Sequence, residues 1–339
     1  MTATTALRTA IIPVGLTGPQ QYPLCRAIPL ELLPLAGKPL IQHAMEEAAL
    51  AGAERFLVLL RSDLREVQQF LCGPSEVEDQ LRAEGNWGAL QRIDTLKRLA
   101  GGAAFLFHDG PGGASRWLER ALDFVSDPAV TILLPTDHVA GVRVAARALA
   151  ALDKPLAEGA DAAIACRPAP WEDTLHRLAL ELGERTGAFH RVTAAAPGPA
   201  RAADDRVPVA LGRIAVTTAA LEAACRAGPF DGVFGLVEAL AAGGHDLRAL
   251  PLSQDISDCA SFAQYQRALA ATAPARTRPT AAPAASAVPD AAEATESTEA
   301  RDTPAPSATP DAPGNLAAGD RPLQLDATMR VPSDDRAGT

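Results

Sequence analysis

The sequence has few of the residues that define several classes of protein. Its 5 cysteines are scattered, with no C-x-x-C pair and no zinc-like spacing to the histidines, so we expect reduced thiols and neither a disulfide framework nor a zinc module. No stretch reaches the roughly 18 apolar residues that cross a bilayer. Pro13 and Gly15 interrupt the apolar run Thr9–Leu16 before it forms a signal-peptide core. These absences predict a soluble, cytoplasmic protein with no membrane partner.

Positive charge is also in short supply. The chain carries 31 Lys and Arg against 41 Asp and Glu, which gives a net charge of -10. Nucleic-acid binders depend on an attraction between Lys or Arg side chains and phosphates that does not depend on base sequence. We therefore expect no nucleic-acid partner. Hydrophobic residues make up 47% of the chain, which is enough for one large folded core.

The composition changes sharply near Ala270. From Ala271 onward the chain consists mainly of Ala, Pro, Thr, Ser, Asp and Glu, and its prolines are spaced too closely for a helix or strand to continue. This change predicts a folded domain at residues 1–270 and a disordered tail at residues 271–339. Within the tail, the apolar residues of Arg321–Arg330 are either a short docking motif or the end of a linker.

Before this change, short apolar runs alternate with stretches of helical periodicity. The expected strands are Thr9–Val14, Arg55–Leu60, Ala103–His108 and Val130–Pro135. The expected helices are Pro39–Ala51, Leu64–Leu71, Glu76–Leu99 with a break at Gly85, and Ala114–Val125. This alternation predicts an α/β fold whose mixed, mostly parallel sheet has helices on both faces. Ligands of such sheets bind beyond the carboxyl ends of the strands.

Two motifs near the start of the chain carry a resemblance. Ala27–Pro34 reads Ala-Ile-Pro-Leu-Glu-Leu-Leu-Pro, and Lys38–Gln42 reads Lys-Pro-Leu-Ile-Gln. Together they resemble the opening of the bacterial UTP:glucose-1-phosphate uridylyltransferases, which are sugar-phosphate nucleotidyltransferases. Ile132–His138, Leu211–Ile214 and Ser257–Ser261 resemble later parts of the same family. The resemblance implies a three-layer, Rossmann-like, GT-A-like domain that converts UTP and glucose 1-phosphate into UDP-glucose and pyrophosphate, with Mg2+.

The resemblance places a nucleotide at the loop after the first strand and at the following motif. Gly15, Gly18, Gln20 and Glu31 fall on nucleotide-binding positions of the family. However, Gln20 stands where the family has an arginine, and Leu30 stands where it has a lysine. Losing a cation that clamps a transferred phosphoryl group can lower a rate by several powers of ten. The catalytic residues therefore remain unassigned, and turnover is doubtful.

The base-recognition stretch of the family corresponds to His108–Ser115. His108 takes the position of a glutamine, and Gly113 aligns with a family glycine. An imidazole can hydrogen-bond a pyrimidine edge, but it cannot offer a donor and an acceptor together as an amide does. The stretch is therefore either a base-binding segment or an ordinary glycine-rich turn between strand and helix.

Asp137 and Asp258 are the candidate metal ligands. Asp137 follows a buried strand, and Asp258 resembles the second aspartate of the family's magnesium site. Two alternatives stay open: Thr136 falls on the ligand position in another alignment, and both carboxylates could belong to ordinary strand ends and turns.

Two hypotheses about function follow. The first is an active enzyme that uses UTP and a sugar 1-phosphate. The second is a pseudoenzyme that serves as a binding or regulatory subunit, as a homo-oligomer or together with an active paralogue. The segment 191–200 has no Glu-Lys-Pro to hold a sugar phosphate. The loss of several cationic contacts at once favours the second hypothesis.

Overall fold

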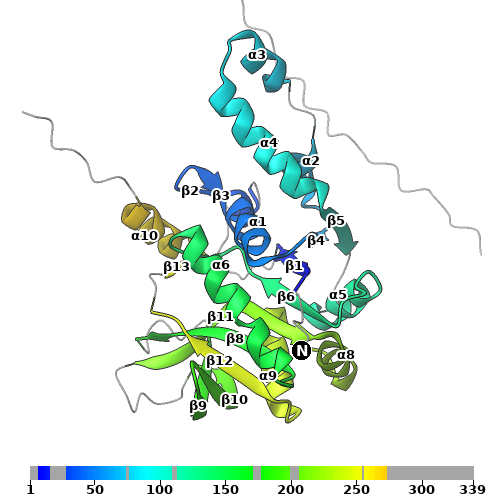
Figure 1. Ribbon diagram of the computed structural model, residues 1–339, viewed down its shortest axis with the longest axis vertical. Helices are drawn as coiled ribbons and strands as arrows, with labels where there is room; N and C mark the ends of the chain where they lie inside the picture. Colours follow the sequence, from blue (N-terminus) through cyan, green and yellow to red (C-terminus); the bar gives the residue numbers. More distant parts are fainter. Residues whose placement is uncertain are drawn as a thin grey trace, which may run out of the picture. The chain divides into compact units, whose positions relative to one another are not determined.

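The computed structural model describes most of the chain between residues 7 and 272. The described residues are 7–15, 28–73, 76–108, 113–170, 177–198, 206–253 and 256–272, and they belong to one unit. Figure 1 shows that helices and strands alternate as expected from the sequence. None of the described helices is both long and apolar enough to cross a membrane. The four described cysteines form no disulfide.

A nine-stranded sheet runs through this unit in the order β5-β4-β1-β6-β11-β8-β12-β10-β9. Its first part is parallel, because β1 pairs with β4 and β6 in the same direction and β4 pairs likewise with β5. The sequence predicted these four strands almost to the residue. Their bounds are β1 Thr9–Val14, β4 Arg55–Arg61, β5 Ala103–His108 and β6 Ala129–Leu133.

The second part of the sheet corrects the expectation of a mostly parallel arrangement. Here β11 runs antiparallel to β6 and β8, and β10 runs antiparallel to β12 and β9, so that only β8 and β12 are parallel. A two-residue connection, residues 187–188, joins β9 to β10, and a connection this short permits only an antiparallel pair. The bounds are β8 Ala162–Ala169, β9 Leu178–Thr186, β10 Phe189–Pro197, β11 Val207–Thr217 and β12 Leu247–Pro251.

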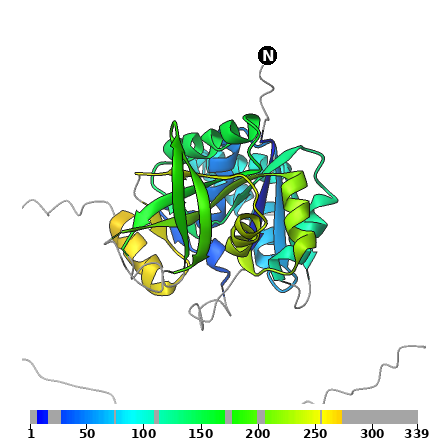
Figure 2. The same ribbon diagram turned by 90° about the horizontal axis from the view of Figure 1, so that it is seen from below.

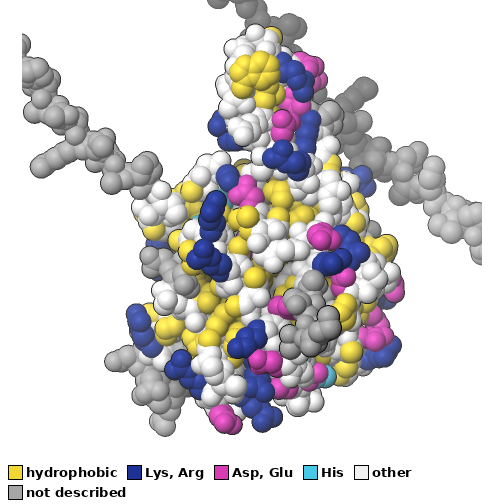
Figure 3. Space-filling model, in the orientation of Figure 1, with side chains coloured by type: hydrophobic (Ala, Val, Ile, Leu, Met, Phe, Trp, Pro, Cys, Tyr) yellow, Lys and Arg dark blue, Asp and Glu magenta, His cyan; other side chains and the backbone are white. Residues whose placement is uncertain are grey.

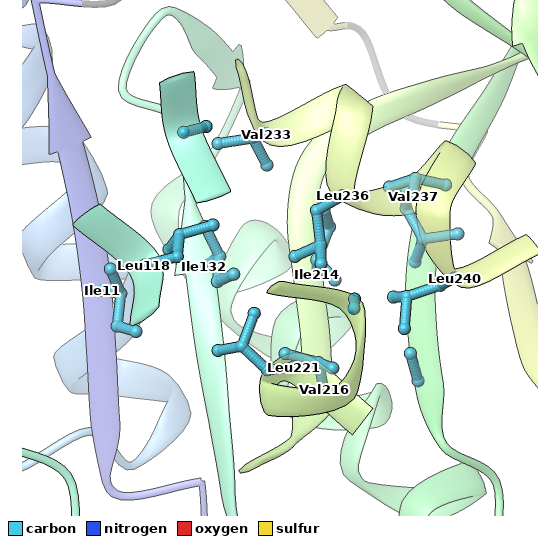
Figure 4. Close-up of a cluster of buried hydrophobic side chains, with 14 of the residues drawn as sticks. Ile11, Leu118, Ile132, Ile214, Val216, Leu221, Val233, Leu236, Val237 and Leu240 are labelled. Atoms are coloured by element: carbon cyan, nitrogen blue, oxygen red, sulfur yellow. The ribbon is translucent and has the colours of Figure 1, made fainter. Parts of the chain in front are cut away.

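Helices pack against both faces of the sheet. Along β1, Ile11 belongs to one hydrophobic cluster and Ile12 to the other, because successive side chains of a strand point to opposite faces. Figure 4 shows the first cluster, in which Ile132 and Ile214 of the sheet lie beneath Leu118, Leu221 and Leu236 of three helices. Those helices are α5 Gly113–Leu122, α8 Thr218–Ala227 and α9 Gly232–Ala242.

The opposite face holds the second cluster. It contains Ile41, Met45, Val67, Ala100 and Leu149, which come from four helices. These helices and a short one that follows them are α1 Leu40–Ala51, α2 Arg65–Cys72, α4 Trp87–Gly101, α6 Val142–Ala151 and α7 Asp153–Ala157. The predicted end of α1 is confirmed, since Gly52 takes the left-handed conformation at its carboxyl end.

A helical projection extends from one end of the sheet (Figure 1). It consists of α3 (Val77–Ala83) and the first turns of α4, and the predicted break at Gly85 is confirmed by a φ of 68°. Val77 and Trp87 are exposed on it, and Figure 3 shows hydrophobic side chains gathered there. Whether this projection mediates self-association stays a prediction.

The last helix packs on the segment that contains the Lys38–Gln42 motif. A third cluster joins Leu30, Leu35 and Leu40 to Tyr265 of this helix, whose hydroxyl donates a hydrogen bond to the Pro34 carbonyl at 2.6 Å. The helix lies on the side of the unit opposite α8 (Figures 1 and 2). The bounds are η3 Leu30–Leu32, β2 Pro34–Leu35, β3 Lys38–Pro39 and α10 Phe262–Thr272.

The helix α10 ends at Thr272, two residues beyond the predicted boundary at residue 270. The remainder of the proposed tail, residues 273–339, lies outside the described residues, and so does the stretch Arg321–Arg330. The division into a domain and a disordered tail therefore stays a prediction.

A buried ion pair joins the first helix to the centre of the sheet. Arg213 of β11 donates from Nε and Nη2 to the two carboxylate oxygens of Glu47 in α1, at 2.7 and 2.8 Å. Both side chains are buried. Burial lowers and the Glu47 carboxylate raises the pKa of the Arg213 guanidinium, and the net direction is upward, so the charge is retained.

Removing one partner of this pair is expected to destabilise the fold strongly. Glu47→Ala leaves a buried guanidinium without its carboxylate, and we expect the free energy of unfolding to fall by about 3–5 kcal/mol. Urea denaturation measures this change. The matched control is Glu222→Ala, which breaks an exposed pair with Arg226 and should cost less than about 1 kcal/mol. Equal losses in the two variants would contradict the prediction.

Candidate functional site

A cleft opens at the carboxyl ends of β1 and β6, at the edge of the sheet where ligands of α/β proteins bind. Its cavity volume is about 200 Å³. The walls come from the ends of these two strands, from η3, from the start of α9 and from the segment before α10. The lining residues are Pro13, Glu31, Leu134, Pro135, Thr136, Asp137, Arg177, Gly232, Val233, Phe234, Asp258, Ala260 and Gln264.

Two of the predicted site residues meet at this cleft. Asp137 begins β7 (Asp137–Val139) and Asp258 ends β13 (Ile256–Asp258), and the two short strands pair antiparallel with these aspartates directly opposite each other. The expectation that the two carboxylates converge is therefore confirmed. Like charges placed opposite each other on paired strands repel, so the pair requires a cation.

That cation is Arg177, which lies immediately before β9. Its Nη2 donates to Asp137 Oδ1 at 2.6 Å and its Nη1 to Asp137 Oδ2 at 3.1 Å. Its Nε donates to Asp258 Oδ2 at 2.9 Å, and Nη2 lies 2.6 Å from the same oxygen. Nη1 also donates to the Ala210 carbonyl at 3.3 Å. All three nitrogens of the guanidinium are thus engaged, and only 4% of the side chain is exposed.

Backbone amides hold the two carboxylates in place. Gly212 N donates to Asp137 Oδ2 at 2.7 Å, and Ala260 N donates to Asp258 Oδ1 at 2.8 Å. A Cβ atom on Gly212 would lie 2.4 Å from the Cβ of Leu134, so only glycine brings this amide close enough. The Gln264 amide adds a third hydrogen bond to Asp258, at 2.9 Å to Oδ2. Each of the four carboxylate oxygens therefore accepts at least one hydrogen bond.

The charges of this cluster are fixed by its own members. Burial raises and Arg177 lowers the pKa of the Asp137 carboxyl, and the net direction is downward. Burial lowers and the two aspartates raise the pKa of Arg177, and the net direction is upward. At neutral pH Asp137 is thus held as a carboxylate and Arg177 as a guanidinium.

The arrangement does not fit Mg2+ as it stands. Mg2+ binds oxygen ligands at about 2.0–2.1 Å in octahedral geometry, whereas every oxygen of Asp137 and Asp258 accepts hydrogen bonds from the protein. An ion bound by both carboxylates would also lie against the Arg177 guanidinium. Among the described residues, no group of three or more His, Cys, Asp or Glu is arranged to hold a metal. A role of the two aspartates as ligands stays a prediction that requires Arg177 to move away.

Glu31 is the other acidic residue of the cleft. It lies in η3 with 3% of its surface exposed, and its Oε1 accepts a hydrogen bond from Gly15 N at 2.9 Å. No described residue hydrogen-bonds to Oε2. Burial raises the pKa of the Glu31 carboxyl, which outweighs the lowering by hydrogen bonds and by Arg61. Gly15 has a φ of 81°, a left-handed conformation that favours glycine. Glu31 and Gly15 therefore determine the shape of the chain at the end of β1 together.

Leu30 does not face the cleft, which corrects the expectation that it replaces a cation beside the nucleotide. Its side chain is 2% exposed and belongs to the cluster with Leu33, Leu35, Leu40 and Tyr265. The short helix η3 turns Glu31 toward the cleft and Leu30 into this apolar cluster.

The predicted base-binding residues lie elsewhere along the sheet edge. His108 ends β5, the outermost strand, and its ring stacks on Trp117 with the centroids 4.8 Å apart. Gly113 starts α5 with a φ of 63° and lies too close to the Phe230 carbonyl to carry a Cβ atom. Neither residue lines the cleft at β1 and β6. Gly18 and Gln20 lie outside the described residues, so their predicted contacts with a nucleotide remain predictions.

Sequence reasoning missed Arg177. The residue lies 40 positions from Asp137 and 81 from Asp258, and no local motif marks it. The only available signal was indirect, because two carboxylates expected to converge need a positive partner. Of the cleft residues, Phe234 and Gln264 were also without a sequence signal.

Comparisons with known proteins agree with the resemblance. No family model matches the chain. The UTP–glucose-1-phosphate uridylyltransferase of Bacillus subtilis (strain 168) is 29% identical over 133 residues, which cover 39% of this chain and 45% of that protein. The protein of the same name from Komagataeibacter xylinus is 29% identical over 133 residues, or 39% of this chain and 47% of that protein. The chain thus matches about half the length of these curated relatives.

Solved structures share the fold over a longer stretch. A UTP-bound UGPase from Acinetobacter baumannii has a TM-score of 0.67 and 17% identity, and the match covers 78% of this chain and 93% of that one. A UDP-glucose pyrophosphorylase complexed with UDP-glucose has a TM-score of 0.63 and 15% identity, covering 78% and 98%. At these identities the likeness shows the α/β fold alone.

Placing a charge at residue 30 is expected to destabilise the fold strongly. Leu30→Lys buries an ammonium in an apolar cluster, and we expect the free energy of unfolding to fall by about 3 kcal/mol or more. Leu30→Met keeps the volume and should cost less than about 1.5 kcal/mol. Urea denaturation of both variants checks this. A lysine variant as stable as the methionine variant would show that the side chain reaches solvent.

The pKa of Glu31 predicts a pH dependence of stability. Because the folded pKa is raised above the ordinary value of 4.5, the free energy of unfolding decreases as the pH rises from that value through the folded pKa. Glu31→Gln removes this penalty and keeps an acceptor for Gly15. We expect it to be more stable than the parent at pH 8, with the difference closing near pH 4.5.

Thermal unfolding between pH 4 and pH 8 measures this difference. Glu119→Gln on the exposed face of α5 is the matched control. A constant difference between Glu31→Gln and the parent at every pH would show that the carboxyl does not titrate in this range.

Proposed function

We propose that this chain, a divergent relative of the UTP–glucose-1-phosphate uridylyltransferases, binds a uridine nucleotide sugar in the cleft, does not perform uridylyl transfer, and acts as a binding or regulatory subunit. The observation that carries the proposal is the charge of the cleft. Its described lining contains three acidic side chains, Glu31, Asp137 and Asp258, and a single basic one, Arg177. Arg177 is already bound to two of the three carboxylates.

Uridylyl transfer needs cations at the transferred phosphoryl group. The reaction brings two anions together and spreads charge over phosphoryl oxygens, so enzymes of this kind place cations at the transferred group. Two like charges about 4 Å apart near a protein surface repel by roughly 4 kcal/mol. The basic side chain of the described lining, Arg177, is already paired with two carboxylates. The negative charge of the lining therefore repels a triphosphate more strongly than a ligand of lower charge.

The remaining walls suit the neutral rings of such a ligand. Pro13, Leu134, Val233 and Phe234 form an apolar surface, and the Gln264 amide lies at its margin. Binding sites for small molecules combine a mainly apolar lining with a few placed polar groups. UDP-glucose has three rings, uracil, ribose and glucose, and a diphosphate, and its charge is smaller than that of UTP. We therefore rank UDP-glucose above UTP and above a sugar 1-phosphate as the ligand.

We also propose a finer fold class for this chain and a protein partner. The helices on both faces of the sheet support assignment to the three-layer, Rossmann-like, GT-A-like nucleotidyltransferase class. A regulatory subunit needs a second protein, and we propose an active paralogue or a further copy of this chain. Trp87 on the helical projection is an exposed apolar side chain that such a partner could cover.

The second candidate function is an active uridylyltransferase that uses UTP, glucose 1-phosphate and Mg2+. The observation in its favour is the identity of 29% over 133 residues with curated enzymes of that name. This function requires Arg177 to release the two aspartates and requires cations from residues outside the described ranges. Within the described ranges, the cleft favours the binding function.

Pyrophosphate release separates the two functions. With UTP, glucose 1-phosphate and Mg2+, we expect no pyrophosphate above the blank at micromolar protein, a rate at least about 1,000-fold below that of an active uridylyltransferase assayed in parallel. Release that depends on Mg2+ and disappears in Asp137→Ala would establish the second candidate function.

Ligand-induced thermal shifts test the binding function directly, because a ligand of the folded state alone must stabilise it. At equal concentrations we expect UDP-glucose to raise the Tm more than UTP, since its charge is smaller. Phe234→Ala should reduce the shift, and Phe124→Ala on the exposed surface should not. No shift with any uridine ligand, or a larger shift with UTP, would contradict the proposal.

A further inference from the structure

We propose that Arg177 is an internal counter-ion that takes the place of a divalent cation between Asp137 and Asp258, and that its removal turns this carboxylate pair into a divalent-metal site. The inference concerns the same cleft as the proposed function and deepens it, since it identifies the cation on which that cleft is built. It does not depend on whether a nucleotide binds.

The backbone is the reason that a cation is needed here. The pairing of β7 with β13 sets Asp137 opposite Asp258 and Ser257 opposite His138. Two carboxylates in this position repel each other, and both side chains are largely buried, so water screens them little. Without a positive charge between them, one carboxylate would have to take up a proton or the strands would have to separate.

The Arg177 guanidinium supplies the positive charge between the two carboxylates. Its guanidinium contacts Asp137 with Nη1 and Nη2 and contacts Asp258 with Nε and Nη2. The Ala210 carbonyl accepts a further hydrogen bond from Nη1. With all three nitrogens engaged and 4% of the side chain exposed, Arg177 cannot contact a phosphate without breaking one of these bonds. It therefore acts as a structural counter-ion and is not a ligand-binding cation.

A divalent cation is the natural alternative to this guanidinium. Mg2+ in proteins is commonly bound by one or two carboxylates together with water, and Mn2+ prefers the same oxygen ligands. Once Arg177 is replaced by an apolar residue, Asp137 Oδ1 and Asp258 Oδ2 lose their protein cation and still face each other across β7 and β13. The backbone amides of Gly212 and Ala260 continue to orient them.

The experiment compares the parent protein with Arg177→Met in the absence of nucleotide. Thermal unfolding at pH 7.5 is followed in EDTA, in MgCl2 or MnCl2, and in NaCl of matched ionic strength, and bound Mn2+ is counted by electron paramagnetic resonance. For the parent we expect no metal-dependent change in Tm and no stoichiometric Mn2+ binding. For Arg177→Met we expect a Tm about 10 °C lower in EDTA.

In Arg177→Met, MnCl2 should restore about 5–10 °C of that loss at a concentration of about 100 times the dissociation constant, with one Mn2+ bound per chain. NaCl should not restore it. The control variant Arg177→Met/Asp258→Asn keeps the packing and removes one carboxylate, and it should lose both the restored Tm and the bound Mn2+.

Two results would overturn the inference. One is stoichiometric Mn2+ binding by the parent, which would show that the pair takes a metal with Arg177 in place. The other is an Arg177→Met protein that folds and binds no Mn2+. If this variant folds only when refolded with MnCl2, the inference is supported. If it folds under neither condition, the Mn2+ count on the parent and on the neutral variant Arg177→Gln decides. Binding by the glutamine variant and none by the parent supports the inference, and any other result opposes it.

Because no nucleotide is present, these outcomes are independent of the thermal shifts with UDP-glucose. If the parent binds no uridine ligand and also binds no Mn2+, the proposed function alone is refuted. Metal binding by the parent together with a UDP-glucose shift would refute the counter-ion role alone.

Discussion

The contact of Arg177 with Asp137 and Asp258 is the interaction on which the architecture of the cleft depends. It joins three segments that are distant in sequence, namely the start of β9 and the two strands β7 and β13. A buried ion cluster contributes little net stability, because desolvation offsets much of the attraction. Its effect is to favour one arrangement, since loss of Arg177 would leave two largely buried carboxylates without a positive partner.

The same cluster is one part of the framework that surrounds the cleft. The strands, the glycine at residue 212 and the converging carboxylates maintain the shape of the cleft. In this cleft the positive charge of Arg177 is directed at two carboxylates, and Leu30 packs under α10 in the third hydrophobic cluster.

Two contacts outside the cleft stabilise the elements that form its walls. The Arg213–Glu47 pair ties β11, which also carries Gly212, to the first helix. The hydroxyl of Tyr265 ties α10 to the segment that presents Glu31. Both walls of the cleft are therefore supported by contacts with residues that never reach its interior, and a change in those contacts is expected to alter its shape.

Local pattern in the sequence determined the four strands of the parallel part of the sheet, the break at Gly85 and the glycine that ends α1, because hydrophobic period and backbone freedom are properties of neighbouring residues. The resemblance to a known family, and not the spacing of residues, indicated that Asp137 and Asp258 meet. Only the tertiary structure decided the antiparallel half of the sheet, the burial of Leu30 and the place of Arg177 between the two aspartates. These depend on strand register and on partners 40 and 81 residues away, and no local pattern encodes which distant charge an arginine will meet.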